Sequence, residues 1–234
     1  MIGLLARLGT ACAVFVVCLT GKTGLLAELR CRDNRHLLDV MDRLRTITGI
    51  VDLDSLTAME YRKAGTSGIA AEVFDQPVRP RVPEPTPPDR PLDDVDLELI
   101  KELVVDGRAT YADLAPRVGL SQAGVRARVQ RLLEENLIVI QATSGAKALG
   151  LAAFSAVLIS VQGPIDPIAD KLFAMPEFTV VALTSGSYDL VGEVWCRDNA
   201  HLLDTLDSIR SLDGVGAVVS NTYLEIEKEE YRLG

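Results

Sequence analysis

The chain has 234 residues and a formal net charge of −9, and apolar residues make up 48% of it. This length allows one or two domains, and the apolar content is sufficient for buried cores. The negative balance argues against a protein that coats nucleic acid non-specifically, although a local basic patch is compatible with it. Four cysteines are too few for a disulfide-stapled extracellular domain, so we expect a reduced, cytoplasmic protein.

The first twenty residues, MIGLLARLGTACAVFVVCLT, carry one charge, Arg7. Such a run is typical of a secretory signal or a membrane anchor, but an internal repeat favours a different interpretation. At an offset of 165, residues 14–60 align without a gap with residues 179–225, and 18 of the 47 positions are identical. The repeat lays the apolar run on a β-rich segment deep inside the chain. We therefore predict a strand in which Val14, Val16 and Leu19 are buried, and no cleavage after Ala11 or Ala13.

A proline-rich segment separates the two halves of the repeat. Seven of the fifteen residues from 77 to 91 are proline, a density that favours extended polyproline structure and excludes packing as helix or sheet. A ligand for a partner that recognises PxxP segments is one interpretation, and an interdomain spacer is the simpler one. We expect a linker over residues 63–91.

The segment after the linker has the pattern of three short helices. Thr110 and Asp113 have the spacing of a capping box, Gly119 is suited to end the second helix, and Ser121 to cap the third. Two short helices joined at a glycine turn are typical of helix-turn-helix DNA binding. The apolar residues predicted to face the core are Leu97, Ile100, Leu103 and Val104 in the first helix and Val125, Val129 and Leu132 in the third.

The third helix presents polar side chains opposite its core stripe. If this helix enters the major groove, Arg126 can donate two hydrogen bonds to a guanine edge and Gln122 can pair with adenine. Arg128 and Arg131 flank that face, where they suit phosphates, as does the helix amino end at Ser121. The solvated face of an ordinary helical bundle is the alternative. The residues predicted to face the groove are Gln122, Ala123, Arg126, Ala127 and Gln130.

These motifs resemble the Lrp/AsnC (feast/famine) family of transcriptional regulators from about Pro91 to Gly234. The resemblance implies a winged helix-turn-helix domain over residues 92–145 and an effector-binding, oligomerising domain over residues 146–234. Two positions depart from the family pattern: Asn136 replaces a usual glycine, and Pro116 falls inside the second helix. The matching residues are Leu92, Asp93, Asp96, Ile100, Leu103, Asp106–Arg108, Leu114, Ala115, Val118–Ser121, Val125, Arg128, Val129, Arg131, Leu132, Ile138 and Leu149–Leu151.

The C-terminal stretch has the order βαββαβ, which is the ferredoxin-like plan with helices on one face of an antiparallel sheet. The fold class is therefore α+β. The expected strands are 154–161, 178–184, 190–196 and 215–226, and the expected helices are 165–173 and 198–210.

The resemblance places a small-molecule effector, an amino acid or a related metabolite, at the turn from Ser185 to Asp189. Backbone N–H groups of a glycine turn can bind a carboxylate, and Asp189 can bind an ammonium group. The alternative is that Asp189 only stabilises a tight turn. The predicted effector residues are Gly186, Ser187, Tyr188 and Asp189 in the turn, with Thr222 and Tyr223 on the last strand.

The N-terminal repeat, residues 1–62, is a partial ferredoxin-like unit because it begins at the end of the first helix and lacks the first strand. In the complete fold that strand is central, so its absence leaves its neighbours unpaired. Either another strand fills the gap, or the start lies inside a longer gene that encodes two full units. Gly24 stands at the position of Asp189, which disables the first effector turn. We expect this repeat to pack against the C-terminal domain and imitate the family's dimer within one chain.

Other chemistry has little support in the sequence. Cys31 with His36 and Cys196 with His201 mimic a Cys₂His₂ site, but duplication explains their recurrence, so we expect no metal and no cofactor. We find no nucleophile–base pair or phosphate loop and expect no enzyme. The predicted function is DNA-binding regulation by a homodimer or higher homo-oligomer that binds double-stranded DNA. A ligand-binding or scaffolding paralogue that has lost operator binding is the alternative, and an exported or membrane-anchored sensor is a third.

Overall fold

The computed structural model describes residues 12–64, 90–138, 140 and 150–229. The chain forms two compact units: one combines the N-terminal repeat with the C-terminal domain, and the other contains the helices between them. The predicted linker over residues 63–91 and the wing expected after the third helix lie almost entirely outside the described residues. No helix in the described ranges is long and apolar enough to cross a membrane.

The helical unit consists of α4 (Asp94–Val105), α5 (Tyr111–Val118) and α6 (Gln122–Glu134). Its predicted caps are confirmed: Thr110 and Asp113 form a capping box, Gly119 ends α5 in the left-handed conformation, and Ser121 accepts a hydrogen bond from Gly124. Asn136 has a φ of +54°, the geometry expected where it replaces glycine. The core stripe of α6, Val125, Val129 and Leu132, is at most 1% exposed.

The prediction for the face of α4 was wrong in part. Leu99 and Leu103 are buried, whereas Leu97 and Val104 are 45% and 38% exposed. Apolar residues occur all around this helix, so spacing alone selects a stripe rotated away from the true one. Pro116 lies in the last turn of α5, and the helix continues past it to Val118.

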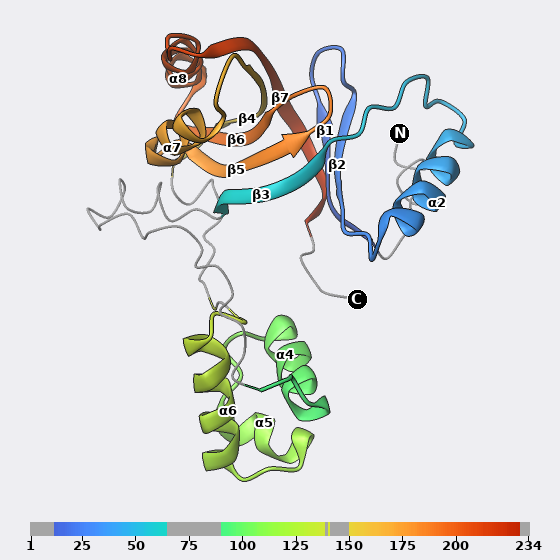
Figure 1. Cartoon of the computed structure of the whole chain (residues 1–234), viewed down its shortest axis with the longest axis vertical. Coiled ribbons are helices and arrows are strands. Elements are labelled where there is room, and N and C mark those ends of the chain that lie inside the picture. Colours follow the sequence, from blue (N-terminus) through green and yellow to red (C-terminus); the bar gives the residue numbers. More distant parts are fainter. Residues whose placement is uncertain (1–11, 65–89, 139, 141–149, 230–234) are drawn as a thin grey trace. The chain divides into compact units, whose positions relative to one another are not determined.

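The C-terminal domain has the predicted βαββαβ order. Its elements are β4 (Ala153–Val161), α7 (Asp166–Ala174), β5 (Phe178–Ser185), β6 (Leu190–Cys196), α8 (Asn199–Arg210) and β7 (Val215–Glu229). The strands are antiparallel, in the order β7-β4-β6-β5, and α7 and α8 lie together on one face of the sheet (Figure 1). The core between them includes Val157, Ile159, Phe178 and Ile209, none of them exposed.

The N-terminal repeat contributes β1 (Ala13–Leu19), β2 (Leu25–Leu29), α2 (Asn34–Arg45) and β3 (Thr57–Ala64). The expected burial of Val14, Val16 and Leu19 in a strand is confirmed, since their exposed fractions are 2%, 2% and 5%. With the added offset of 165, the bounds of α2 become those of α8 (34 + 165 = 199 and 45 + 165 = 210). The other N-terminal elements fall within β5, β6 and β7 by the same arithmetic.

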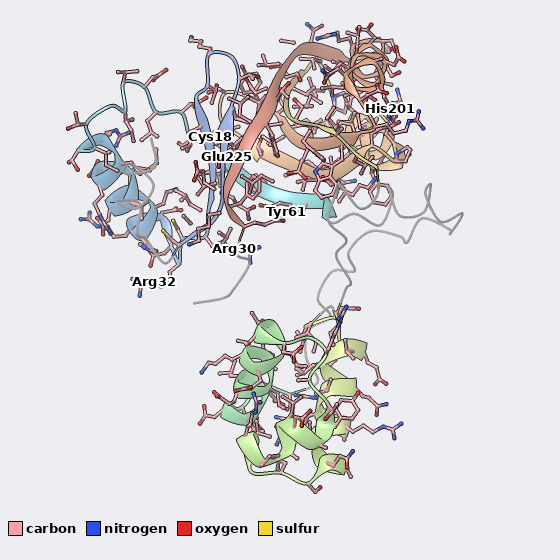
Figure 2. The ribbon with its side chains drawn as sticks, turned by 180° about the vertical axis from the view of Figure 1, so that it is seen from behind. Cys18, Arg30, Arg32, Tyr61, His201 and Glu225 are labelled. Atoms are coloured by element: carbon pink, nitrogen blue, oxygen red, sulfur yellow. The ribbon has the colours of Figure 1, made fainter. Side chains whose placement is uncertain are left out.

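The repeat and the domain exchange their last strands and form one seven-stranded sheet, β2-β1-β7-β4-β6-β5-β3. β7 pairs with β1, and β3 pairs with β5. The two pairings have the same register: Val17 lies opposite Ile226, and the residues 165 positions away, Ala182 and Tyr61, also lie opposite each other. Figure 2 shows another such pair, Cys18 and Glu225, side by side on β1 and β7. The exchange is therefore reciprocal and has pseudo-twofold symmetry.

Candidate nucleic-acid interface and effector turn

The outward face of α6 is formed by the residues that the sequence analysis assigned to the groove. Gln122, Ala123, Arg126, Ala127 and Gln130 are all exposed. Arg126 makes no ion pair or side-chain hydrogen bond with any residue in the described part of the chain. Its guanidinium group is therefore available to a ligand, and the cap at Ser121 fixes where the helix amino end begins.

Arg128 and Arg131 lie elsewhere, in a cluster with the capping box of α4. Nη1 of Arg128 lies 2.7 Å from Oδ1 of Asp93 and 2.8 Å from Oδ1 of Asp96, and Nη2 of Arg131 lies 2.7 Å from Oδ2 of Asp96. The Asp96 side chain is fully buried, and the two arginine side chains are about one quarter exposed. The cluster thus joins the recognition helix to the start of α4. Phosphates would have to compete with these carboxylates for both arginines.

The ionisation of the cluster follows from these contacts. Hydrogen bonds from Arg128 and from the backbone N–H of Asp96 hold the pKa of Asp93 well below its ordinary value. Burial raises the pKa of Asp96, but hydrogen bonds from Arg128, from the backbone N–H of Asp93 and from Arg131 outweigh the effect of burial and lower the pKa. Both carboxylates are therefore charged at neutral pH.

The predicted effector turn meets the N-terminal repeat. Ser187 donates a hydrogen bond of 2.9 Å to Asp54, and Gly186 adopts a φ of +145°. A Cβ atom at Gly186 would lie 2.7 Å from the Leu56 side chain and 2.9 Å from the carbonyl oxygen of Ser55, so only glycine fits. Residues 54–56, which the sequence analysis did not include, therefore form the opposite wall of this turn.

Asp189 is held by the backbone of β4. Its Oδ2 accepts a hydrogen bond of 2.7 Å from the N–H of Val161, and its own N–H donates to the carbonyl of Ile159. Thr184 donates to the carbonyl of Tyr188 and closes the turn. One carboxylate oxygen of Asp189 thus stabilises the turn, which is the role that the sequence analysis gave as the alternative to effector binding. The side chain is half-buried, and its other oxygen can still accept a hydrogen bond from a ligand.

Thr222 and Tyr223 face a different turn from the one predicted. The N–H of Thr222 binds Oγ1 of Thr20, at the end of β1, and Tyr223 donates a hydrogen bond of 2.8 Å to Glu193. Because the exchange is reciprocal, the counterparts of Thr222 and Tyr223 near Ser187 are Thr57 and Ala58 of the N-terminal repeat (222 − 165 = 57 and 223 − 165 = 58). The six predicted effector residues therefore do not form one site. Gly186 to Asp189 lie in the C-terminal turn, whereas Thr222 and Tyr223 lie beside the equivalent turn of the N-terminal repeat.

Comparison with known families decides the identity. Residues 92–133 match the AsnC-type helix-turn-helix domain, and residues 153–233 match the Lrp/AsnC ligand-binding domain. The HTH-type transcriptional regulator FL11 of Pyrococcus furiosus is 31% identical over 144 residues, which cover 61% of this chain and 95% of that protein. The chain belongs to the Lrp/AsnC family. It is a DNA-binding transcriptional regulator with a domain that binds small molecules.

Other Lrp/AsnC regulators support the same conclusion. The HTH-type transcriptional regulator Rv2324 of Mycobacterium tuberculosis is 35% identical over 125 residues, 51% of this chain and 83% of that one. Among solved structures, the leucine response regulatory protein of M. tuberculosis has a TM-score of 0.55 at 29% identity, over 61% of this chain and 99% of its own. The AsnC protein of E. coli has a TM-score of 0.52 at 25% identity, over 58% and 94%. Residues 1–91 lie outside both family matches.

The Cys–His pairs of this Lrp/AsnC chain have structural roles. Nδ1 of His36 accepts a hydrogen bond from the backbone N–H of Arg32, and Nδ1 of His201 accepts one from that of Arg197. The other ring nitrogen of His201 lies 3.1 Å from Glu177. These bonds fix the strand-to-helix corner in both halves of the repeat. Within the described ranges, no group of three or more His, Cys, Asp or Glu side chains has a metal-binding arrangement.

Proposed function

We propose that the protein reads operator DNA sequence-specifically through α6 and responds to an amino acid or related metabolite at the Ser185–Asp189 turn. The exposed face of α6, with Arg126 unpaired among the described residues, carries the first half of this proposal. A helix of this kind reads base edges in the major groove, and Arg pairs bidentately with guanine. Ser121, Gln122, Ala123, Arg126 and Gln130 are the proposed contacts. Arg128 and Arg131 position the helix through Asp93 and Asp96.

Replacement of Arg126 by alanine is expected to weaken binding to the operator by about 1–3 kcal/mol and to relax the preference at one base pair, because a bidentate base contact is lost. Fluorescence anisotropy with operator variants at a fixed salt concentration measures both effects. Lys101→Ala, which removes a cation from the exposed face of α4, is the matched control and should leave the preference intact. An unchanged preference in Arg126→Ala would remove this helix from the groove.

For the effector, the turn offers backbone N–H groups to a carboxylate and two acidic side chains, Asp54 and Asp189, to an ammonium group. Asp189→Asn keeps an acceptor for the N–H of Val161 but removes the charge. We therefore expect it to abolish amino-acid binding without loss of folding or of basal DNA binding. Calorimetry against the twenty amino acids tests this, with Asp204→Asn, at an exposed position on α8, as control. Equal binding by wild type and Asp189→Asn would leave Asp189 as a turn residue only.

The strand exchange bears on assembly. In this chain each last strand already pairs within the same polypeptide, so the surface that would exchange strands with a second chain is occupied. The described residues then contain one helix-turn-helix unit beside the two units that exchange strands. The homo-oligomer expected from the family would need another surface, and a two-half-site operator would need two chains.

A scaffolding or ligand-binding protein without operator binding is the second candidate. It is favoured by the engagement of Arg128 and Arg131 with carboxylates, which leaves fewer cations beside the groove-facing residues. A mobility shift on the DNA upstream of the gene, measured over a range of salt concentrations, separates the two. Specific binding whose affinity falls with salt supports the regulator, and its absence supports the second candidate.

A further inference from the structure

The two exchanged strands, β3 and β7, are interchangeable in register. Every pair of β1 with β7 becomes a pair of β5 with β3 when 165 is added to the first number and subtracted from the second (for example, 16 + 165 = 181 and 228 − 165 = 63). Both ladders are irregular at the same point, where no residue lies opposite Glu227 of β7 or Arg62 of β3 (227 − 165 = 62). Arg62 and Glu227 are thus the extra residues of equivalent bulges, which turn a side chain out of the regular alternation.

The two strands differ in charge only at this bulge. Residues 60–63 are EYRK and residues 225–228 are EIEK. Lys63 holds β3 to α7, because its Nζ donates hydrogen bonds of 2.8 Å to the carbonyl of Met175 and 3.2 Å to that of Phe173. Lysine is also present at the equivalent position 228, so this contact cannot distinguish the two strands.

Arg62 is surrounded by carboxylates. Its Nε lies 2.7 Å from Oε1 of Glu60, its Nη1 lies 2.8 Å from Oδ1 of Asp170, and its Nη2 pairs with Asp166. The two aspartates are four residues apart on α7, so they present their carboxylates side by side. The arginine side chain is only 13% exposed, although both aspartate side chains are more than two thirds exposed. β3 therefore places a nearly buried cation against an acidic pair on α7.

A strand with the sequence of β7 would place a carboxylate where Arg62 lies. Glu225 and Glu227 would then join Asp166 and Asp170 in a group of four carboxylates without the cation. Exposed ion pairs contribute little to stability, but like charges brought together in a poorly exposed place disfavour the pairing. Discrimination between the two strands therefore comes mainly from repulsion of the wrong one, which is a common source of specificity.

We propose that Arg62, with Asp166 and Asp170, determines which strand the C-terminal domain accepts beside β5. The accepted strand is β3 of an N-terminal repeat. The excluded strand is β7 of a second copy, which the equal register would otherwise admit. Strand exchange thus joins two unlike halves and does not join two C-terminal domains.

The first test reverses charges in the full chain. Arg62→Glu should accelerate hydrogen exchange in β3 and β5 by about tenfold or more, and adding Asp166→Arg and Asp170→Arg should restore the wild-type rates. Arg62→Met removes the charge without reversing it and should have a smaller effect. Arg35→Glu, which reverses one charge of the exposed ion pair with Asp39 on α2, is the matched control and should leave β3 unchanged. If Arg62→Glu does not fold, recovery of folding in the triple variant gives the same answer.

The second test concerns the choice of strand. When both aspartates of α7 are replaced by arginine, α7 repels Arg62 and suits Glu227 of a second copy. Ala182 lies opposite Tyr61, whose equivalent is Ile226 (226 − 165 = 61). Ala182→Cys with Ile226→Cys should therefore give disulfide-linked dimers in the charge-reversed chain, because opposed residues of neighbouring strands lie within disulfide distance. The same two substitutions with the aspartates intact should give none.

The proposal is overturned by any of four results. These are unchanged exchange in Arg62→Glu, no recovery when the α7 aspartates are reversed as well, an equal effect of Arg62→Met, which would leave packing as the cause, and equal amounts of linked dimer with and without the aspartates. The experiments involve neither DNA nor an effector. Their failure is therefore distinguishable from failure of the proposed regulatory function.

Discussion

Asp96→Ala is expected to destabilise the helical unit by roughly 3 kcal/mol and to abolish operator binding at 37 °C, although Asp96 touches no DNA. Asp96 is buried and binds both Arg128 and Arg131. Its removal leaves Arg131 without its carboxylate partner in a partly buried place, and Arg128 then keeps only Asp93. It also removes half of the capping box at the start of α4. Thermal unfolding and anisotropy measured on the same preparation would show both losses together.

Asp94→Ala is the matched control, since Asp94 lies on the same helix and is exposed. We expect its effect on stability to stay below about 1 kcal/mol. If the two variants melted alike, the cluster would contribute nothing to the attachment of α6 to α4.

The same cluster predicts the acid response of the helical unit. The pKa of Asp96 is lowered in the folded state, so the unfolded chain binds a proton more readily than the folded one. Its contribution to stability is therefore present above the ordinary aspartate pKa of about 3.8–3.9 and is lost as the pH falls below that value. In Asp96→Ala this part of the acid dependence should be missing.

Local patterns in the sequence were sufficient for the helix caps, the order of the C-terminal elements and the strand at the start of the chain. Caps depend on residues three positions apart, as with Thr110 and Asp113. The positive φ of Asn136 could be predicted because asparagine is one of the few residues other than glycine that adopt this conformation. Composition alone could not distinguish β1 from a signal or anchor segment. The repeat did so, because it aligns β1 with an apolar segment deep inside the chain that could only be a strand.

Long-range contacts account for what the sequence could not provide. Arg128 and Arg131 have the spacing of phosphate ligands, but their partner Asp96 lies 32 and 35 positions away and only the packing of α6 on α4 unites them. The opposite wall of the effector turn comes from residues 54–56, over 130 positions from Ser187. The signal that could have located it was the repeat itself, because reciprocal pairing of equivalent strands assigns each turn to the other half.

Val17→Asp is expected to cost more than about 4 kcal/mol and to remove cooperative unfolding of the sheet unit. Val17 is completely buried on the central part of β1 and lies between Leu26 of β2 and Ile226 of β7. A carboxylate there has no partner and must either be neutralised or draw water into the sheet. Because β1 is the strand that joins β2 to β7, its loss would also free the exchanged end of β7.

The matched control is Val51→Asp, the same substitution in the same repeat at a side chain that is 99% exposed. It should leave the melting temperature within a few degrees of wild type, since surface substitutions usually change stability by no more than about 0.5 kcal/mol. Circular dichroism and limited proteolysis would follow the sheet unit, and operator binding would follow the helical unit. If β1 contributed nothing to the fold, Val17→Asp and Val51→Asp would melt at the same temperature. If β1 pairs with β7 as the structure shows, only Val17→Asp loses the sheet unit. The helical unit should still fold in both variants, because it has a separate core around Leu99 and Val125.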